Sequence, residues 1–377
     1  MKFTQSIFAA AFAFAAAAAF AAPVTTQGVG VGKHGDIQVA VTFDNGKIQK
    51  IDILKNAENP VLAKKVFTDL KDQIVAANSV QLDGISGATF TSKGLFAAVE
   101  DAAKKAGVTL GQADKKALKA AVKDLPKDAS YDVVVIGAGG AGFSAAIEAK
   151  NAGATVVLLE KMPQVGGNSL ISGAEMNAAK NWVQPKLGIT DDSPELHAKD
   201  TYLGGDKKGD MKVINVMTHN ALAGAEWCRD YLGVRFEPDN LFFFGGHSRK
   251  RALIPVGHTG TEFITKFQAK ADELGIPVIT NMKAEELIKD KSGRVVGVKA
   301  TMNGAEYTFN AKGGVVLATG GFGANPAMVK KYNPKIDERF KTTDAPGTTG
   351  EALYMAQRAG AELVNMQYIQ TYPICDP

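Results

Sequence analysis

Apolar and polar residues alternate in the first part of this 377-residue chain in a way that predicts a small α+β domain. Alternation over 37–43 and 47–54 predicts two strands, and Asn45-Gly46 between them predicts a tight hairpin turn. Apolar residues at every fourth position predict a helix over 62–77. A second helix is predicted over about 92–105.

A different pattern further along the chain predicts a buried parallel strand. Val133–Ile136 are consecutive apolar residues that lead directly into a GxGxxG sequence at 137–142. A helix over 140–152 and a second strand over 155–159 are predicted to follow. Further strand-type runs lie at 276–280, 295–300 and 307–310. We therefore predict an α/β domain of the Rossmann type.

The residues after the first of these strands suit a dinucleotide. Gly137 permits a tight turn, Gly139 lets the backbone approach a pyrophosphate, and Gly142 lets the helix pack closely on the strand. Glu160 follows about 20 residues beyond the glycines, where it can accept hydrogen bonds from ribose hydroxyls. A second small-residue turn at 166–169 favours FAD over NAD, because a bulky bound flavin can lie against its backbone.

A third glycine-rich stretch, GVVLATGG at 314–321, repeats the passage of a buried strand into glycines. By itself it indicates either a packed strand end or a backbone that approaches a ligand closely. Together with the first glycine motif it favours a flavin-binding fold. The polar segment 108–129 is predicted to be a linker between a domain over 22–107 and a dinucleotide-binding domain over 130–377.

The N-terminal residues 1–21 are predicted to be a secretory signal peptide. Lys2 precedes a stretch of alanine and phenylalanine, and Ala19-Phe20-Ala21 has the A-x-A form of a cleavage site before Ala22. A membrane anchor is the alternative, but the stretch is short and rich in alanine for a span that needs about 20 strongly apolar residues. We therefore expect export to the periplasm.

Charge and cysteine content exclude several classes of protein. The net charge of +4 is mild, which argues against nucleic acid or an anionic membrane as a partner. Cys228 and Cys375 form neither a CxxC metal site nor a CxxCH haem site, and the five histidines lack metal-ligand spacing. The sequence leaves open whether the two cysteines form a disulfide or are buried as free thiols.

The stretch 83–94, DGISGATFTSKG, places small residues and hydroxyls ahead of the second predicted helix. A phosphate bound here would meet free N–H groups and the positive end of the helix dipole. The alternative is an ordinary capped helix, with Thr91 or Ser92 as the N-cap residue. The residue types alone leave both interpretations open.

Asp83-x-x-Ser86-Gly87-Ala88-Thr89 resembles the flavinylation motif of FMN-binding domains. The resemblance implies FMN attached to Thr89 through a phosphoester, with Thr91 as the second candidate, and a flavin transferase for maturation. Together with the glycine motifs and the run AGAELVNMQYIQTYP at 359–373, it extends over nearly the whole chain. The chain resembles the flavoproteins of the flavocytochrome c fumarate reductase family, especially its urocanate-reducing members.

This resemblance implies an α/β Rossmann-like FAD-binding domain of the fumarate reductase flavoprotein type (FAD-dependent oxidoreductase 2), preceded by a small α+β FMN-binding domain. FAD is expected to be non-covalent. The implied FAD contacts are Gly137, Gly139, Gly140, Ala141, Gly142, Glu160, Lys161, Gly167, Asn168, Ser169, Gly173, Ala284, Thr319, Gly320 and Glu351.

The family also implies a reaction. Electrons pass from a c-type cytochrome or a membrane quinol-linked donor through FMN to FAD, and then as hydride to the C=C bond of an enoate in anaerobic respiration. Urocanate, reduced to imidazole propionate, is the expected substrate, and fumarate, methacrylate or cinnamate are alternatives. An FMN electron-transfer module and an NAD-dependent dehydrogenase are rival classes, but an exported protein has little access to nicotinamide.

Two departures from the family pattern bear on the substrate site. Fumarate-reducing members have a histidine where this chain has Tyr372, which resembles the urocanate-reducing members. A phenol there is expected to bind substrate by a hydrogen bond or by lying against a planar ring, and simple packing is the alternative. The proton-donating arginine of the family has no counterpart before Pro377, so it is expected beyond that residue.

Overall fold

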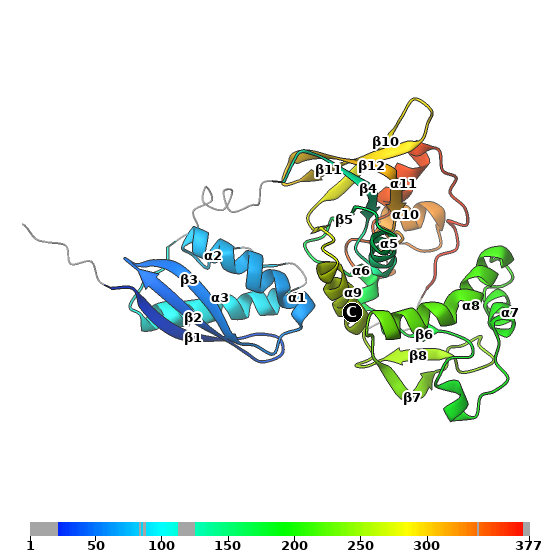
Figure 1. The fold of residues 1–377 in the computed structure, drawn as a ribbon, viewed down its shortest axis with the longest axis horizontal. Helices are drawn as coiled ribbons and strands as arrows, with labels where there is room; N and C mark the ends of the chain where they lie inside the picture. Colours follow the sequence, from blue (N-terminus) through cyan, green and yellow to red (C-terminus); the bar gives the residue numbers. More distant parts are fainter. Residues whose placement is uncertain (1–21, 83, 86–87, 112–124, 338, 372–377) are drawn as a thin grey trace, which may run out of the picture. The chain divides into compact units, whose positions relative to one another are not determined.

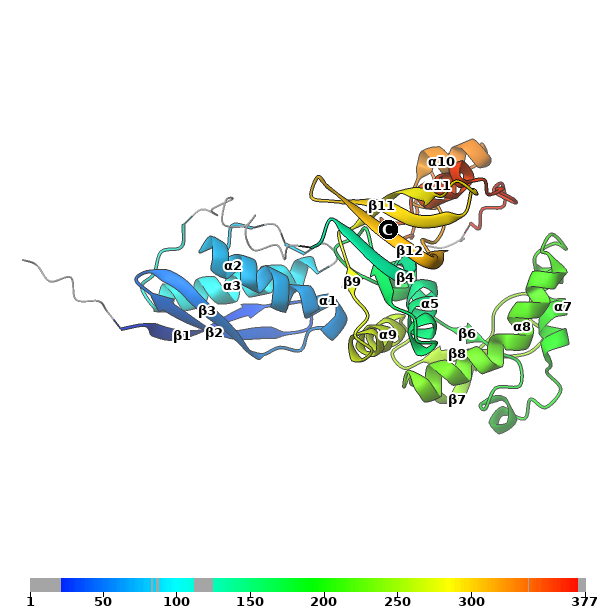
Figure 2. The ribbon, with the colours of Figure 1, turned by 45° about the horizontal axis from the view of Figure 1, so that its top comes forward.

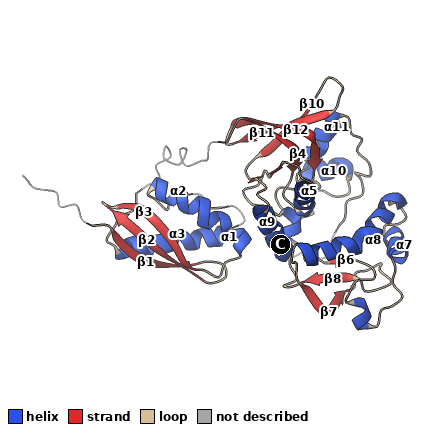
Figure 3. Cartoon of the chain, viewed as in Figure 1, coloured by secondary structure: helices blue, strands red, loops and turns tan. Residues whose placement is uncertain are grey.

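The structure, a computed structural model, describes residues 22–82, 84–85, 88–111, 125–337 and 339–371. The predicted signal peptide lies outside the described residues, as do Asp83, Ser86, Gly87, Tyr372 and Cys375. The chain divides into two compact units, the first containing residues 1–59 and 65–123 and the second containing residues 60–64 and 124–377. The elements of each are labelled in Figure 1, and Figure 3 distinguishes helices from strands.

The first unit contains an antiparallel sheet in the order β1-β2-β3. Its strands are β1 (Val24–Val31), β2 (Asp36–Asp44) and β3 (Lys47–Lys55). The predicted hairpin is confirmed, because Asn45 and Gly46 have positive φ angles of 48° and 74°, which suit the twist of the two strands. Alternate residues of β2 face the core: Ile37, Val39, Val41 and Phe43.

The helix predicted over 62–77 is present as three consecutive helical segments. These are α1 (Pro60–Lys65), a π-helical segment (Val66–Leu70) and α2 (Lys71–Ala77). The apolar residues spaced four apart were predicted to lie on one helix face. From the π-helical segment onward these residues are buried in the core: Val66, Leu70 and Ile74.

Helix α3 (Thr89–Lys105) begins three residues before the predicted start at Ser92. Its N-cap residue is Ala88, so the prediction that Thr91 or Ser92 caps the helix is wrong. The reason is that both hydroxyls lie inside the first turn. The Ser92 hydroxyl donates to the carbonyl of Ala88 at 2.9 Å and accepts from the N–H of Ile85 at 3.0 Å.

Helix α3 lies directly against β1, because glycines leave no side chains between the two backbones (Figure 2). A Cβ atom on Gly28 would lie 1.9 Å from the carbonyl oxygen of Ala98, and one on Gly30 would lie 2.1 Å from that of Gly94. Both distances are far shorter than van der Waals contact. Only glycine therefore allows this packing.

The second unit is organised around a six-stranded sheet in the order β10-β11-β12-β4-β5-β9. Neighbours from β12 to β9 are parallel, and β10 and β11 add an antiparallel edge. The strands are β4 (Asp128–Ile136), β5 (Val156–Leu159), β9 (Val278–Ile279), β10 (Lys283–Lys289), β11 (Val295–Met302) and β12 (Ala305–Leu317). Helix α5 (Gly140–Asn151) joins β4 to β5, which confirms the predicted Rossmann-type unit.

The two strands predicted on either side of Lys312-Gly313 are one strand, β12. Its residues 305–310 pair antiparallel with β11, and its residues 308–317 pair parallel with β4. The register shifts between Ala311 and Gly314. The prediction of two strands was wrong because Lys312-Gly313 interrupts the apolar pattern at this irregularity without ending the strand.

Both faces of the sheet are covered, as the uninterrupted apolar run of β4 requires. Val135 faces α5 and α9 (Thr261–Glu273), whereas Val134 faces the opposite side, where Met355 of α11 (Glu351–Ala359) packs. Figure 2 shows α5 beside α9 and places α11 across the sheet. Alternate residues of β4 thus belong to two hydrophobic cores, one on each face of the sheet.

A three-stranded sheet in the order β6-β8-β7 forms a further layer of the second unit. Arg251, directly before β8, is fully buried and contacts Asp192 through Nη2 at 2.8 Å and Asp200 through Nη1 at 2.7 Å. Burial opposes the charge on Asp192, yet hydrogen bonds from Arg251 and Gln184 hold the pKa of this carboxyl below its usual range.

The remaining elements are α6 (Gly167–Ile171), β6 (Met176–Asn177), a 3₁₀ turn (Gln184–Leu187), α7 (Pro194–Gly204), α8 (Met211–Glu226), a π-helical segment (Trp227–Tyr231), β7 (Phe236–Phe242), β8 (Ala252–Pro255) and α10 (Pro326–Tyr332).

Cys228 is a free thiol in the core beside α5. Burial raises the pKa of this thiol to about 11, so it stays protonated at neutral pH. For Cys228 this agrees with the second of the two alternatives drawn from the sequence, whereas Cys375 lies outside the described residues. No helix among the residues that the structure describes combines the length and the apolar character of a membrane span.

The contact between β1 and α3 gives a stability prediction. Gly30→Ala should lower the free energy of unfolding by about 3 kcal/mol, because the new Cβ must displace the backbone of α3. Gly111→Ala is the matched control, since a Cβ at Gly111 meets no atom within 4 Å. Chemical denaturation followed by circular dichroism measures both, and equal midpoints would contradict the close packing.

Candidate functional site

The first glycine motif forms the connection from β4 to α5, at the carboxyl end of the parallel strands. Gly137 has a φ of 101°, and a Cβ there would lie 2.5 Å from the carbonyl oxygen of Ala318. A Cβ on Gly142 would lie 1.8 Å from the carbonyl oxygen of Gly137. These two glycines are therefore required by the shape of the loop itself.

Gly139 differs from them, because the protein does not need a glycine at this position. Its φ of −87° is ordinary, and a Cβ would make only normal contacts, with Gly166 and Ser169 at 3.7 Å. Such a side chain would enter the space at the N-terminus of α5, where the N–H groups of Ala141 and Gly142 have no helical partner. The loop therefore fits a pyrophosphate, which needs bare backbone and a helix N-terminus.

Glu160 follows β5 directly and supports the glycine loop. Its Oε2 accepts a hydrogen bond from the N–H of Ala138 at 2.9 Å, and its Oε1 accepts one from the N–H of Met162 at 2.8 Å. Burial raises the pKa of Glu160, although these N–H groups favour the carboxylate. Each oxygen keeps a lone pair, so the carboxylate can still accept a bond from a ribose hydroxyl.

The second glycine turn packs against the first. The N–H of Gly166 donates to the carbonyl of Ala138 at 2.8 Å. The hydroxyl of Ser169, in α6, accepts from the N–H of Gly140 at 3.1 Å. Two glycine-rich stretches that each suggested FAD from the sequence are thus joined into one surface.

Asn168 connects this surface to the loop before α11. Its Nδ2 donates to Asp344 Oδ1 at 2.6 Å, and its Oδ1 accepts from the N–H of Ala345 at 2.5 Å. A Cβ on Gly167 would meet no atom within 4 Å, so the adjacent space is open. No sequence motif indicated Asp344, which lies 176 residues from Asn168.

Lys161, Thr349 and Glu351 form a polar cluster at the start of α11. Lys161 Nζ donates to Glu351 Oε2 at 2.9 Å and to the hydroxyl of Thr349, which itself donates to Glu351. Burial opposes ionisation of Glu351, but the hydrogen bonds from Thr349 and Lys161 lower its pKa to about 2. Two predicted FAD contacts therefore bind each other, and Thr349 is a member of the cluster that no motif indicated.

The third glycine stretch adjoins the first loop. The N–H of Ala318 donates to the carbonyl of Ile136 at 2.8 Å, so Thr319 and Gly320 continue from β12 beside the loop. A Cβ on Gly320 would meet no atom within 4 Å. The three glycine-rich stretches therefore meet at the carboxyl ends of β4, β5 and β12.

Two predicted FAD contacts lie further from the loop. Ala284 is in β10, two residues beyond Met282, whose N–H donates to the carbonyl of Glu160 at 2.8 Å. Gly173 follows α6 and lies against its neighbour Glu175, whose carboxylate would be 2.6 Å from a Cβ on Gly173. The roles of both residues in FAD binding stay predictions.

In the first unit, Thr89 is the first residue of α3 and is exposed. Its hydroxyl has no hydrogen-bond partner among the described residues. Thr91 is only 3% exposed, and its hydroxyl donates to the carboxylate of Glu58. Because helical residues two apart point to nearly opposite sides, Thr89 faces outward where Thr91 faces inward. Accessibility therefore favours Thr89 as an attachment point.

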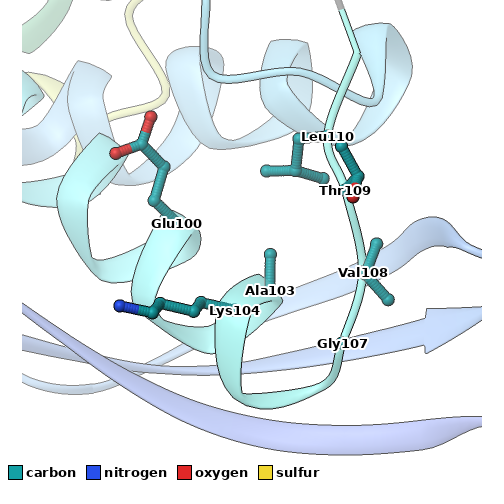
Figure 4. A pocket seen from close by; sticks show the side chains of 7 residues that line it. All are labelled: Glu100, Ala103, Lys104, Gly107, Val108, Thr109 and Leu110. Carbon is teal, nitrogen blue, oxygen red and sulfur yellow. The ribbon is translucent and has the colours of Figure 1, made fainter.

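A hollow of about 430 Å³ lies at the other end of α3 (Figure 4). It is lined by Glu100, Ala103 and Lys104 of the helix and by residues 107–110 after it. A helix rises about 1.5 Å per residue, so the hollow lies roughly 20 Å from Thr89. It is therefore separate from the candidate FMN attachment point.

The glycine loop at the carboxyl end of parallel strands, the acid after the second strand and the second glycine turn define a dinucleotide-binding flavoprotein fold. Comparison with known families agrees with this class. Residues 132–377 match the FAD binding domain family, and residues 32–104 match the FMN-binding domain family. The chain belongs to the FAD binding domain family and carries an FMN-binding domain ahead of it.

Individual relatives are more specific. The chain is 43% identical to a urocanate reductase of Eggerthella lenta over 354 residues, which are 93% of this chain and 58% of that protein. It is 36% identical to a fumarate reductase (cytochrome) of Shewanella frigidimarina, over 69% of this chain and 45% of that protein. The chain thus spans about half the length of these relatives.

The structure is similar to the open conformation of a flavocytochrome c3 fumarate reductase, with a TM-score of 0.59 and 32% identity. The match covers 67% of this chain and 44% of the other. Together with the family matches, this confirms the predicted fold: a Rossmann-like FAD-binding domain of the fumarate reductase type, preceded by an FMN-binding domain.

The open space at Gly139 gives a binding prediction. Gly139→Ala should leave the thermal unfolding of the flavin-free protein unchanged and should weaken FAD binding about tenfold or more, because the methyl group keeps the pyrophosphate from the backbone. Gly204→Ala is the control, since a Cβ there also meets no atom within 4 Å and Gly204 ends α7. Titration of FAD by fluorescence measures the affinity, and an unchanged affinity would remove Gly139 from the site.

Proposed function

We propose that this chain carries FMN and FAD for an exported reductase that adds hydride to the C=C bond of an α,β-unsaturated carboxylate. Urocanate is the preferred substrate, with imidazole propionate as its product, and the process is part of anaerobic respiration. The observation that carries this proposal is the presence of an FAD-binding and an FMN-binding domain in one chain. The first contains the glycine loop at 137–142, and the second contains the exposed Thr89. The 43% identity to a urocanate reductase supports the choice of substrate.

FAD bound at the glycine loop would supply the hydride from its flavin N5. The chain's own residues hold the dinucleotide in place. The bare backbone at Gly139 and the N-terminus of α5 suit the pyrophosphate, and Glu160 is positioned for a ribose hydroxyl. When hydride adds to the β-carbon, negative charge develops toward the carboxylate, so cationic groups and a positioned acid lower the barrier.

The remaining parts of the proposal concern the substrate site, the attachment of FMN, the electron donor and the location of the protein. Tyr372 is proposed to bind the substrate, and an arginine beyond Pro377 is proposed to donate the proton. FMN is proposed to be joined to Thr89 by a flavin transferase. A c-type cytochrome or a membrane quinol-linked protein is the proposed donor, and the flavocytochrome c3 match supports the former. The signal peptide predicted at 1–21 supports a periplasmic location.

Fumarate is the second candidate substrate, because the chain is also 36% identical to a fumarate reductase (cytochrome). The residue that favours urocanate over fumarate is Tyr372, in place of the histidine of fumarate-reducing proteins. An imidazole ring of the substrate can lie against a phenol ring, whereas the second carboxylate of fumarate is better bound by a cationic side chain.

The substrate is tested with the complete protein that the gene encodes. With reduced viologen as electron donor, urocanate should be reduced faster than fumarate, methacrylate and cinnamate. Tyr372→His should shift this preference toward fumarate, because it restores a group that can be cationic. Viologen oxidation followed by absorbance measures each rate. If none of the four compounds is reduced, the proposed reaction is wrong.

The FMN site is tested by Thr89→Ala after co-expression with a flavin transferase. The wild-type chain should gain one FMN mass on the peptide that contains Thr89, and the variant should gain none while it retains FAD, since the two sites belong to separate compact units. Electron delivery from a cytochrome should fall sharply, and reduction by viologen should survive. Mass spectrometry after acid precipitation decides, and FMN without FAD would indicate an electron carrier instead of a reductase.

A further inference from the structure

We propose that Glu58 positions Thr89 for FMN attachment, acting through its hydrogen bond with Thr91. This inference rests on the proposed FMN site. Glu58 is only 7% exposed and has no ion-pair partner among the described residues. A buried carboxylate without a cation is unfavourable unless hydrogen bonds satisfy it. The groups that donate hydrogen bonds to Glu58 therefore indicate the role of its carboxylate.

The Glu58 carboxylate joins three segments of the first unit. Its Oε1 accepts from the N–H of His34, in the connection from β1 to β2, at 2.8 Å. Its Oε2 accepts from the hydroxyl of Thr91, in the first turn of α3. A Cβ on Gly32 would lie 2.4 Å from Glu58 Oε1, so a glycine leaves room for the carboxylate. The surrounding backbone is thus shaped to hold this acid against α3.

This contact fixes the direction in which Thr89 points. With Thr91 held inward by Glu58, a residue two positions earlier on the same helix must face outward. Ile85 and Ala88, ahead of the helix, are held separately by hydrogen bonds with the hydroxyl of Ser92. The first turn of a helix otherwise frays readily. Glu58 and Ser92 together keep the exposed hydroxyl of Thr89 in one place.

The attachment reaction requires such a fixed hydroxyl. Transfer from FAD forms a bond between Thr89 Oγ and the FMN phosphorus and breaks the pyrophosphate bond, so that AMP leaves. The proton of the hydroxyl passes to a base of the transferase, and no group is oxidised or reduced. The attacking oxygen must lie in line with the bond that breaks, and a mobile first turn would make that alignment rare.

The test measures the rate at which the full-length wild-type chain and its variants gain FMN, with a flavin transferase and FAD. Thr91→Val removes the hydroxyl and should slow modification of Thr89 about tenfold or more, whereas Thr91→Ser restores it and should be close to the wild type. Glu58→Gln should also be slow. The Glu58→Gln/Thr91→Val double variant should be no slower than the slower single variant, because both changes break the same contact.

Glu100→Gln is the matched control, since Glu100 is an exposed acid on the same helix, far from Thr89. Circular dichroism establishes that each variant is folded. If the wild-type chain gains no FMN, the proposed FMN site is wrong. If the wild type is modified and folded Thr91→Val or Glu58→Gln is modified equally fast, the site stands and the role of Glu58 is overturned. If Thr91→Val fails to fold, the rate at which folded Glu58→Gln gains FMN decides whether Glu58 has this role.

Discussion

Direct contact between the backbone of a helix and a neighbouring strand or loop is the constraint on which both units depend. In the first unit it is made at Gly28 and Gly30 of β1, and in the second at Gly142 of α5. A helix packed this closely is positioned by its backbone contacts, because any Cβ added at these glycines would collide with a carbonyl oxygen. Both proposed flavin sites lie at such a helix N-terminus, where free N–H groups and the helix dipole favour a phosphate.

Local patterns were sufficient to predict the parts of the fold that depend on neighbouring residues. The hairpin followed from Asn45-Gly46, and the Rossmann-type unit followed from the run before Gly137. Contacts between distant segments were not predictable in this way. The Lys161 and Glu351 pair joins residues 190 apart, and the bond from Asn168 to Asp344 joins residues 176 apart. The continuity of β12 was also missed, because strand pairing outweighed a local break in the apolar pattern.

The predicted FAD contacts illustrate the same limit. Motif spacing indicated that Glu160 is available to a ribose, but it gave no sign that the same carboxylate holds the N–H of Ala138 and so supports the glycine loop. Lys161 and Glu351 were predicted as separate contacts, and the structure shows that they neutralise each other. A residue at a binding site thus has two functions, toward the ligand and toward its neighbours, and sequence motifs describe only the first of them.

The long strand β12 also has a consequence for how the protein is made. Asn310 bonds Asp128 across a separation of 182 residues, and the same pairing brings Ala318 to the first glycine loop. At about 5–20 residues per second, a ribosome needs roughly 10–40 s to supply that partner strand after β4 has been synthesised. During this interval an apolar strand edge is uncovered. The nascent chain is therefore most exposed to aggregation and to chaperones before its flavin site is complete, and FAD can bind only after translation has passed β12.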